Sequence, residues 1–178
     1  MEPVTVSSSR AQLSQIMMPE HANAAGNVHG GTIMKMIDNA ALIAAQRHTR
    51  SNCVTASVDK IDFISPVFIG NLVTVLASVN LAERTSMEIG ARVEAECMIT
   101  GKKAHVGSAY LTFVALDAED KPMPVPGLIL ENDEDKKRNA DARARRESRL
   151  KSRSRHKHSL KDWLVRPEKL MTAMAGHK

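Results

Sequence analysis

With 178 residues, a net charge of +5 and 3% aromatic residues, the chain suits one domain plus an appendage, with a core of aliphatic residues and Met. No apolar run reaches the roughly 18 residues of a transmembrane helix, and the N-terminus lacks the long apolar stretch of a secretory signal. Cys53 and Cys97 are too few for a disulfide framework or a four-cysteine metal site, so we expect a cytoplasmic protein with two buried, reduced thiols.

The positive charge is concentrated near the C-terminus. Residues 1–135 hold 10 Lys and Arg against 16 Asp and Glu, whereas residues 136–158 hold 11 against 2. Because the body is acidic and the basic residues lie in a tail, the overall charge says little about the ligand of the body. We do not expect a nucleic-acid partner.

Composition divides the chain into four parts. Residues 1–9 are predicted to be a flexible N-terminus, and residues 10–120 form the body. Residues 121–132 are a connector in which three prolines at alternate positions force an extended path. Residues 133–178 are a basic tail with good helix formers but almost no apolar stripe, which predicts partial helix or disorder. We therefore expect that the chain can be truncated after Arg138 without loss of the activity of the body.

The first predicted element of the body is a helix from Thr32 to His48. Its apolar residues cover nearly the whole circumference, which predicts a buried helix. Gly30 and Gly31 stand at its start and would leave the amides of the first turn open to a ligand.

Strand-like segments follow the helix, at residues 54–63, 72–81, 87–99 and 106–116. In the first, apolar alternation slips by one residue, which predicts a β-bulge near Asp59–Lys60. Long strands after one buried helix predict an α+β fold, with a curved antiparallel sheet wrapped around that helix. Because a single sheet cannot cover its other face alone, we expect a dimer.

Asp38 is the most unusual residue of the predicted helix. A carboxylate among apolar residues is costly to bury unless it is paired or hydrogen-bonded. A salt bridge to Lys35 at i−3 would explain it, and a catalytic role would explain it equally well. The local pattern leaves both open.

The loop before the helix, residues 19–31, is rich in Asn, Gly and small residues, which suits close approach of a ligand. Asn23 and Asn27 could equally be turn residues, and His21 and His29 could be structural. The loop has neither the Gly-x-Gly-x-x-Gly spacing of a dinucleotide site nor the Gly-Lys-Ser/Thr of a phosphate loop. No cluster in the sequence has metal-ligand spacing.

Five runs carry a resemblance to the hotdog-fold cytosolic acyl-CoA hydrolases, especially the brain-type animal enzyme and its single-domain bacterial relatives, and the resemblance as a whole covers residues from about 12 to 138. They are Asn23-Ala-Ala-Gly-Asn-Val-His-Gly-Gly31, Met34-Lys-Met-Ile-Asp38, Val54-Thr-Ala-Ser-Val-Asp59, Ser86-Met-Glu-Ile89 and Lys121-Pro-Met-Pro-Val-Pro126. The resemblance implies hydrolysis of acyl-CoA to a fatty acid and CoA by a double-hotdog dimer, alone or as a hexameric trimer of dimers.

The same resemblance implies the site residues. Asp38 would be the general base or the nucleophile, and Asn23 of the partner subunit would orient water or substrate. Backbone N–H groups at Gly30 or Gly31 would face the thioester oxygen. No metal or redox cofactor is implied, since CoA is part of the substrate.

The phosphates of CoA require cations that an acidic body must supply locally. The candidates for CoA binding are Lys60, Arg84, Thr85, Ser86, Lys102 and Lys103. Met side chains beside the helix would line a channel for the acyl chain. Two alternatives remain: a hotdog hydratase or dehydratase that pairs His29 with Asp38, and a non-catalytic regulator that senses acyl-CoA.

Overall fold

The structure, a computed structural model, describes residues 1–164, with side chains as far as Lys151. The chain divides into two compact units at Asn139. The elements are β1 (Val4–Thr5), α1 (Val6–Ser9), β2 (Ala11–Ile16), the short 3₁₀ helix η1 (Pro19–His21), α2 (Gly30–Thr49), β3 (Asn52–Phe63), β4 (Asn71–Ala82), β5 (Ser86–Cys97), β6 (Lys103–Leu116), β7 (Leu128–Ile129) and α3 (Asp133–Leu164). No helix within residues 1–164 is long and apolar enough to cross a membrane.

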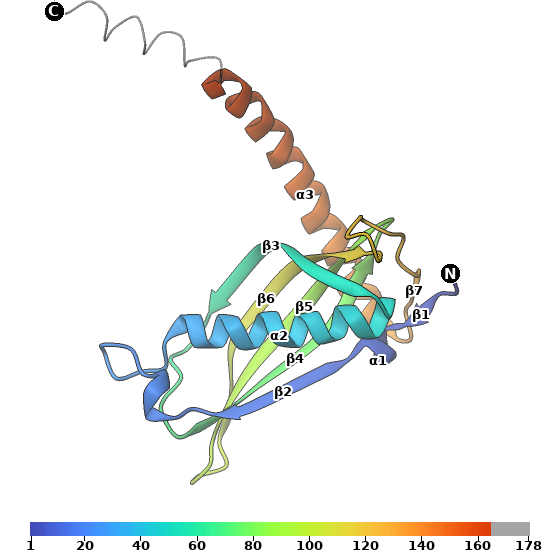
Figure 1. The fold of residues 1–178 in the computed structure, drawn as a ribbon. Coiled ribbons are helices and arrows are strands. Elements are labelled where there is room, and N and C mark those ends of the chain that lie inside the picture. The colour runs from blue at the N-terminus through green and yellow to red at the C-terminus, as the bar shows by residue number, and fades with distance from the viewer. Residues whose placement is uncertain (165–178) are drawn as a thin grey trace, which may run out of the picture. The chain divides into compact units, whose positions relative to one another are not determined.

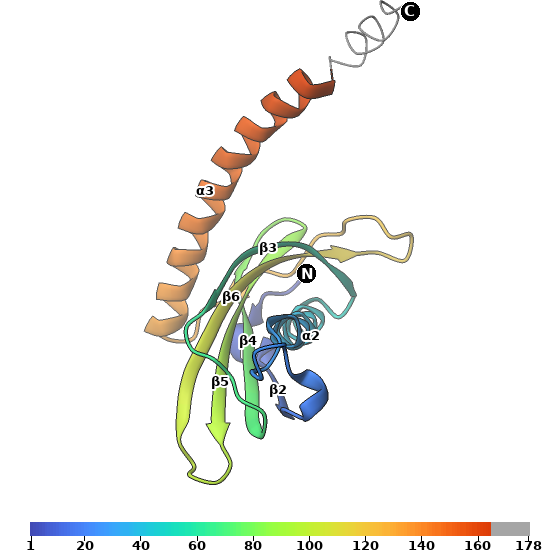
Figure 2. The same ribbon diagram turned by 90° about the vertical axis from the view of Figure 1, so that its left-hand side faces the viewer.

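Five antiparallel strands in the order β2-β4-β5-β6-β3 form a curved sheet, and α2 lies against its inner face (Figures 1 and 2). This is the predicted α+β architecture. The sequence analysis missed β2, which pairs with β4 from Ala11↔Ala77 to Ile16↔Leu72. It also extended β5 too far, because the strand ends at Cys97 and Ile99 is 96% exposed in the turn that follows.

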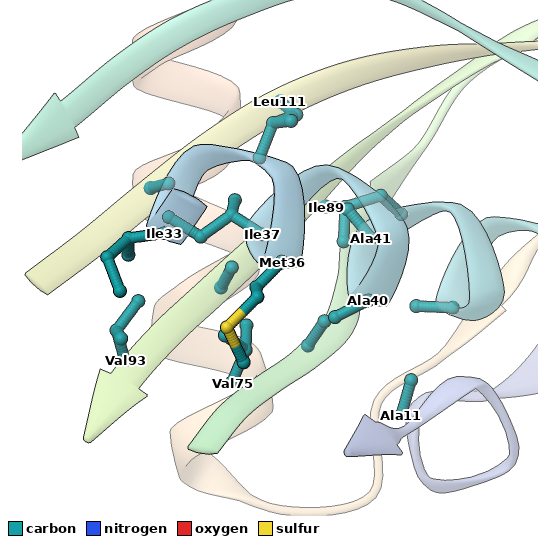
Figure 3. Close-up of a cluster of buried hydrophobic side chains, with 14 of the residues drawn as sticks. Ala11, Ile33, Met36, Ile37, Ala40, Ala41, Val75, Ile89, Val93 and Leu111 are labelled. Atoms are coloured by element: carbon teal, nitrogen blue, oxygen red, sulfur yellow. The ribbon is translucent and has the colours of Figure 1, made fainter. Parts of the chain in front are cut away.

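The core lies between α2 and the sheet. Ile33, Met36 and Ile37 point from one side of α2 toward the sheet, and Ala40 and Ala41 continue that side (Figure 3). The facing side chains include Val75, Ile89, Val93 and Leu111. Small Ala side chains let the helix approach the strands closely, while branched residues fill the space between them. This packing fixes the rotation of α2 and therefore the direction in which Asp38 points.

The far side of α2 is less covered than the sequence predicted. Met34 is 44% exposed, and Asp38 and Leu42, one and two turns further on, are only partly buried. The expectation of a helix buried all round is therefore wrong within a single chain, because one sheet covers only one side. The uncovered side is the surface on which a second chain could pack.

Strand β3 contains two bulges. Its register with β6 shifts between Thr55 and Ser57 and again between Val58 and Lys60. The second shift confirms the predicted bulge near Asp59–Lys60, whereas the first was not foreseen. With two extra residues, Thr55 lies opposite Phe113 and Val58 opposite Leu111, and both of these β6 side chains are buried beneath α2. Thr55 therefore faces the helix.

The connector runs along the body. Val125 N–H donates to the Arg84 carbonyl at 3.0 Å, and Leu128–Ile129 pair in parallel with β1. At the end of α2, the buried His48 donates from Nε2 to the Pro126 carbonyl at 2.9 Å. Burial lowers the pKa of His48, so its ring is neutral and suited to this contact.

About the first two turns of α3, residues 133–139, belong to the body. Asn132 caps the helix by accepting from Asp135 N–H at 2.9 Å. The side chain of Asn139 is buried and donates to the Asn80 carbonyl at 2.7 Å. A cut after Arg138 would remove this bond and leave the Asn80 carbonyl without the Asn139 donor.

We therefore expect two different truncations to behave differently. Truncation after Arg146 should leave the melting temperature unchanged, because only a charged segment is lost. The hydrolytic activity proposed below should stay within about threefold of that of the full chain. Truncation after Arg138 should lower the melting temperature by about 3 °C or more, since a buried carbonyl loses its donor. Circular dichroism melting and thiol release measure both effects. Equal melting temperatures would show that Asn139 contributes nothing to the body.

Candidate functional site

Asp38 lies midway along α2 and receives a hydrogen bond from β3. Thr55 Oγ1 donates to Asp38 Oδ1 at 2.6 Å. Among the contacts of residues 1–151, Asp38 makes no ion pair with Lys35. A salt bridge to Lys35 therefore does not explain the carboxylate. Because Asp38 is only partly buried and Thr55 is exposed, the carboxylate can be reached from solvent. The pair offers an oriented carboxylate beside a hydroxyl.

Asn23 organises the loop before α2. Its Oδ1 accepts from Ala25 N–H at 2.9 Å and from Asn27 N–H at 3.2 Å, while its own backbone N–H donates to the Asn27 carbonyl at 2.7 Å. These bonds hold the side-chain oxygen inside the loop. The Nδ2 group, a donor, takes part in neither of these side-chain bonds, so it can serve a ligand.

The first turn of α2 is only partly open to a ligand. His29 caps the helix, and its Nδ1 accepts from Gly31 N–H at 2.9 Å. The Gly31 amide is therefore occupied, contrary to the expectation that both glycine amides are open. Gly30 N–H makes no hydrogen bond among the described residues, which makes it the better donor for an incoming oxygen. His21 is also structural, because its Nδ1 accepts from Met18 N–H.

A cleft of about 320 Å³ opens between this loop and the segment after β3. It is lined by Asn23, Asn27, Val28, Gly30, Ile33, Phe63, Ile64, Ser65, Pro66 and Val67. The volume is at the lower end for a small-molecule site, and most of the wall is apolar with a few amide groups. No Met lines the cleft, so the predicted Met-lined channel is not this cavity.

Asp38 does not share this cleft with Asn23 and Gly30 of its own chain. Eight residues of α-helix separate Gly30 from Asp38, which corresponds to about 12 Å at 1.5 Å per residue. His29 is one residue further away and is engaged as a cap, so the expected His29–Asp38 pair of a dehydratase does not form within the chain. One reacting carbonyl cannot contact Gly30 and Asp38 of the same chain.

The candidate CoA-binding residues fall into separate groups. Arg84, Thr85 and Ser86 lie at the turn where β5 begins, whereas Lys102 and Lys103 lie beyond its other end. At about 3.3 Å per residue, β5 separates the two groups by about 36 Å. Lys60, on β3, bonds Asp62 at 2.7 Å. Within one chain, the two end groups cannot hold the same CoA.

Comparison with known proteins decides the family. Residues 25–101 match the thioesterase superfamily. An acyl-CoA thioester hydrolase of Bacillus subtilis, described as uncharacterized, is 37% identical over 66% of this chain and 69% of its own. An acyl-CoA hydrolase of Staphylococcus aureus, solved with butyryl-CoA, CoA and CoA disulfide, superposes with a TM-score of 0.84, with 33% identity over 92% of this chain and 99% of its own.

The chain belongs to the acyl-CoA hydrolases of the thioesterase superfamily. The predicted hotdog fold is thereby confirmed. The mouse cytosolic acyl coenzyme A thioester hydrolase is 39% identical over 75% of this chain, but the match covers only 35% of the mouse protein. The chain thus spans about a third of that relative. A hexameric acyl-CoA thioesterase has a TM-score of 0.83 and 34% identity over 85% of this chain and 97% of its own.

Three further structures of the Staphylococcus aureus enzyme carry alanine in place of one aspartate, one asparagine and one threonine. The three positions have the same spacing along that chain as Asp38, Asn23 and Thr55 have in this one. The sequence analysis assigned no role to Thr55. A hydroxyl in a strand is ordinary, and only its position within the run Val54–Asp59 could have suggested one.

Proposed function

We propose that this chain hydrolyses the thioester of fatty acyl-CoA to a free fatty acid and CoA. The observation that carries the proposal is the Asp38 carboxylate of α2, which accepts a hydrogen bond from the Thr55 hydroxyl at 2.6 Å and is open to solvent. The names of its relatives, acyl-CoA hydrolases of bacteria and cytosolic hydrolases of mammals, support this activity and a cytoplasmic location.

Two chemical routes use the same carboxylate. As a general base, Asp38 takes a proton from water, the oxygen attacks the carbonyl carbon, the C–S bond breaks and the CoA thiolate takes the proton back. As a nucleophile, a carboxylate oxygen attacks directly, CoA leaves, and water then hydrolyses the mixed anhydride. In both routes the negative charge on the thioester oxygen is stabilised by Gly30 N–H at the positive end of α2. Thr55 orients Asp38 for either attack.

We infer that each site is shared between two chains. Asn23 and Gly30 line the cleft, and Gly30 is about 12 Å along α2 from Asp38 of the same chain. A second chain must therefore bring its own Asp38 to the cleft. The uncovered side of α2 carries Asp38 and exposed apolar residues, which suits packing against a copy. A dimer, or a trimer of dimers like the hexameric relative, satisfies this geometry.

The acyl chain would enter the apolar cleft, where Phe63 is 53% exposed and Ile64 57% exposed. Lys102 and Lys103 are at the same end of the sheet as the cleft. Phe63 of the cleft pairs with Gly107, which lies four residues after Lys103 on β6. These lysines are therefore better placed for CoA of this cleft than Arg84, Thr85 and Ser86. In a dimer, the latter three could serve the site of the partner.

Thiol release from a series of acyl-CoA chain lengths tests the proposal. We expect kcat/KM above about 10⁴ M⁻¹s⁻¹ for at least one fatty acyl-CoA. Incubation with 3-hydroxyacyl-CoA and enoyl-CoA is the matched comparison. A change in enoyl absorbance without thiol release would support a hydratase instead, and no reaction with any acyl-CoA would refute the proposed hydrolysis.

A further inference from the structure

Asp59 occupies the second bulge of β3 and accepts two hydroxyl hydrogen bonds. Ser57 Oγ donates to its Oδ1 at 2.5 Å, and Thr112 Oγ1 donates to its Oδ2 at 2.8 Å. Ser57 and Thr112 lie directly opposite each other in the register of β3 with β6. One partly buried carboxylate therefore ties two neighbouring strands together immediately after the first bulge.

The first bulge decides which way Thr55 faces. Ala56 is the extra residue between the pairs Thr55↔Phe113 and Ser57↔Thr112. A slip of one residue in a strand turns every side chain to the opposite face of the sheet. If the bulge moved past Thr55, its hydroxyl would leave the side on which α2 and Asp38 lie. The bond between Thr55 and Asp38 thus depends on a fixed bulge.

Within the chain, core packing contributes little to the register of β3 at this point. It is the last strand in the sheet order and pairs only with β6. Most of its side chains between Val54 and Phe63 are exposed or only partly buried, so core packing specifies the register weakly. A carboxylate that bonds hydroxyls on both strands adds a specific contact to this register.

We propose that Asp59 is a positioning residue for the reaction, which fixes the β3 bulge and thereby holds Thr55 against Asp38. The proposal rests on the proposed thioester hydrolysis, in which Asp38 reacts. Asp59 lies on the sheet face away from the helix and acts only through Thr55. Its loss should therefore lower kcat more than it changes KM.

The test is a double-mutant cycle on the full chain. Asp59→Ala and Thr55→Val should each lower kcat about tenfold in thiol release, with KM within about twofold. In the double variant, kcat should fall by no more than about tenfold, because both changes remove the same contact. Asp59→Asn should stay within about threefold of wild type, since an amide can accept from one hydroxyl and donate to the other. The matched control is Glu94→Ala, which removes a carboxylate bonded to Arg92 on another strand.

Hydrogen exchange gives a second readout that does not require activity. In Asp59→Ala, the amides of peptides covering residues 52–63 should exchange at least about fivefold faster than in wild type. In Glu94→Ala, their exchange rate should be unchanged. If Asp59→Ala fails to fold, Ser57→Ala and Thr112→Val each remove one of the two bonds and should each lower kcat about threefold. If the wild type is active but kcat is unchanged in these variants, the proposed role of Asp59 is wrong. An additive loss of about 100-fold in the Asp59→Ala, Thr55→Val double variant would also refute that role, while the proposed hydrolysis would stand. An inactive wild type would instead refute the proposed hydrolysis.

Discussion

Asp38→Asn should lower kcat by about 100-fold or more while the protein remains folded. The asparagine Oδ1 can still accept from Thr55 Oγ1, so the local geometry is kept. An amide can neither take a proton from water nor attack a thioester, so both routes lose their reacting group. The loss corresponds to about 2.7 kcal/mol of transition-state stabilisation. Thiol release at saturating acyl-CoA measures kcat, and circular dichroism checks the fold.

Lys35→Ala is the control for this variant. Lys35 is exposed on the same helix and is the partner that a structural salt bridge would have required. If Asp38 served only such an ion pair, both variants would have the same small effect, because an exposed pair at i−3 contributes a few tenths of a kcal/mol. Full activity in Lys35→Ala beside a large loss in Asp38→Asn separates the two interpretations. Asp38→Asn activity within threefold of wild type would rule out the assignment.

The sequence predicted the features that have a strong local signal, namely the helix α2 and the carboxylate on it. The helix was placed within two residues at each end, because a dense apolar run follows Gly30-Gly31. Asp38 was singled out because a carboxylate is conspicuous among apolar residues. Strand β2 was missed because Ala11–Ile16 is short, its apolar residues do not alternate throughout, and it is defined by its pairing with β4. Non-local pairing leaves little local signal.

The site residues that depend on register were harder to predict. The alternation of Val54, Ala56 and Val58 suggested that these three share a face, but the first bulge breaks it and turns Cys53, Thr55 and Val58 inward. Thr55 could therefore not be assigned to the helix side from the pattern. Charge alone also could not separate Arg84 from Lys102, since only the length of β5 places them at opposite ends of the sheet.

Mixing two inactive variants should restore about a quarter of wild-type activity if each site is shared between chains. Asp38→Asn and Asn23→Ala proteins are unfolded together in equal amounts and refolded, so that about half of the dimers contain one chain of each kind. In such a dimer, one site combines the intact Asp38 of one chain with the intact Asn23 of the other, and the second site lacks both. One quarter of all sites is then complete, and the fraction is the same in a trimer of dimers.

Two differently tagged copies of Asp38→Asn, refolded in the same way, are the control and should recover nothing. Sequential purification on the two tags isolates the mixed dimers, in which activity should rise to about half of wild type per dimer, because every dimer then holds one complete site. The 12 Å of helix between Gly30 and Asp38 is the reason to expect recovery, since a single chain cannot bring both to one carbonyl. Purified mixed dimers without thiol release would mean that each site is built within one chain, and that α2 must bend or shift to close it.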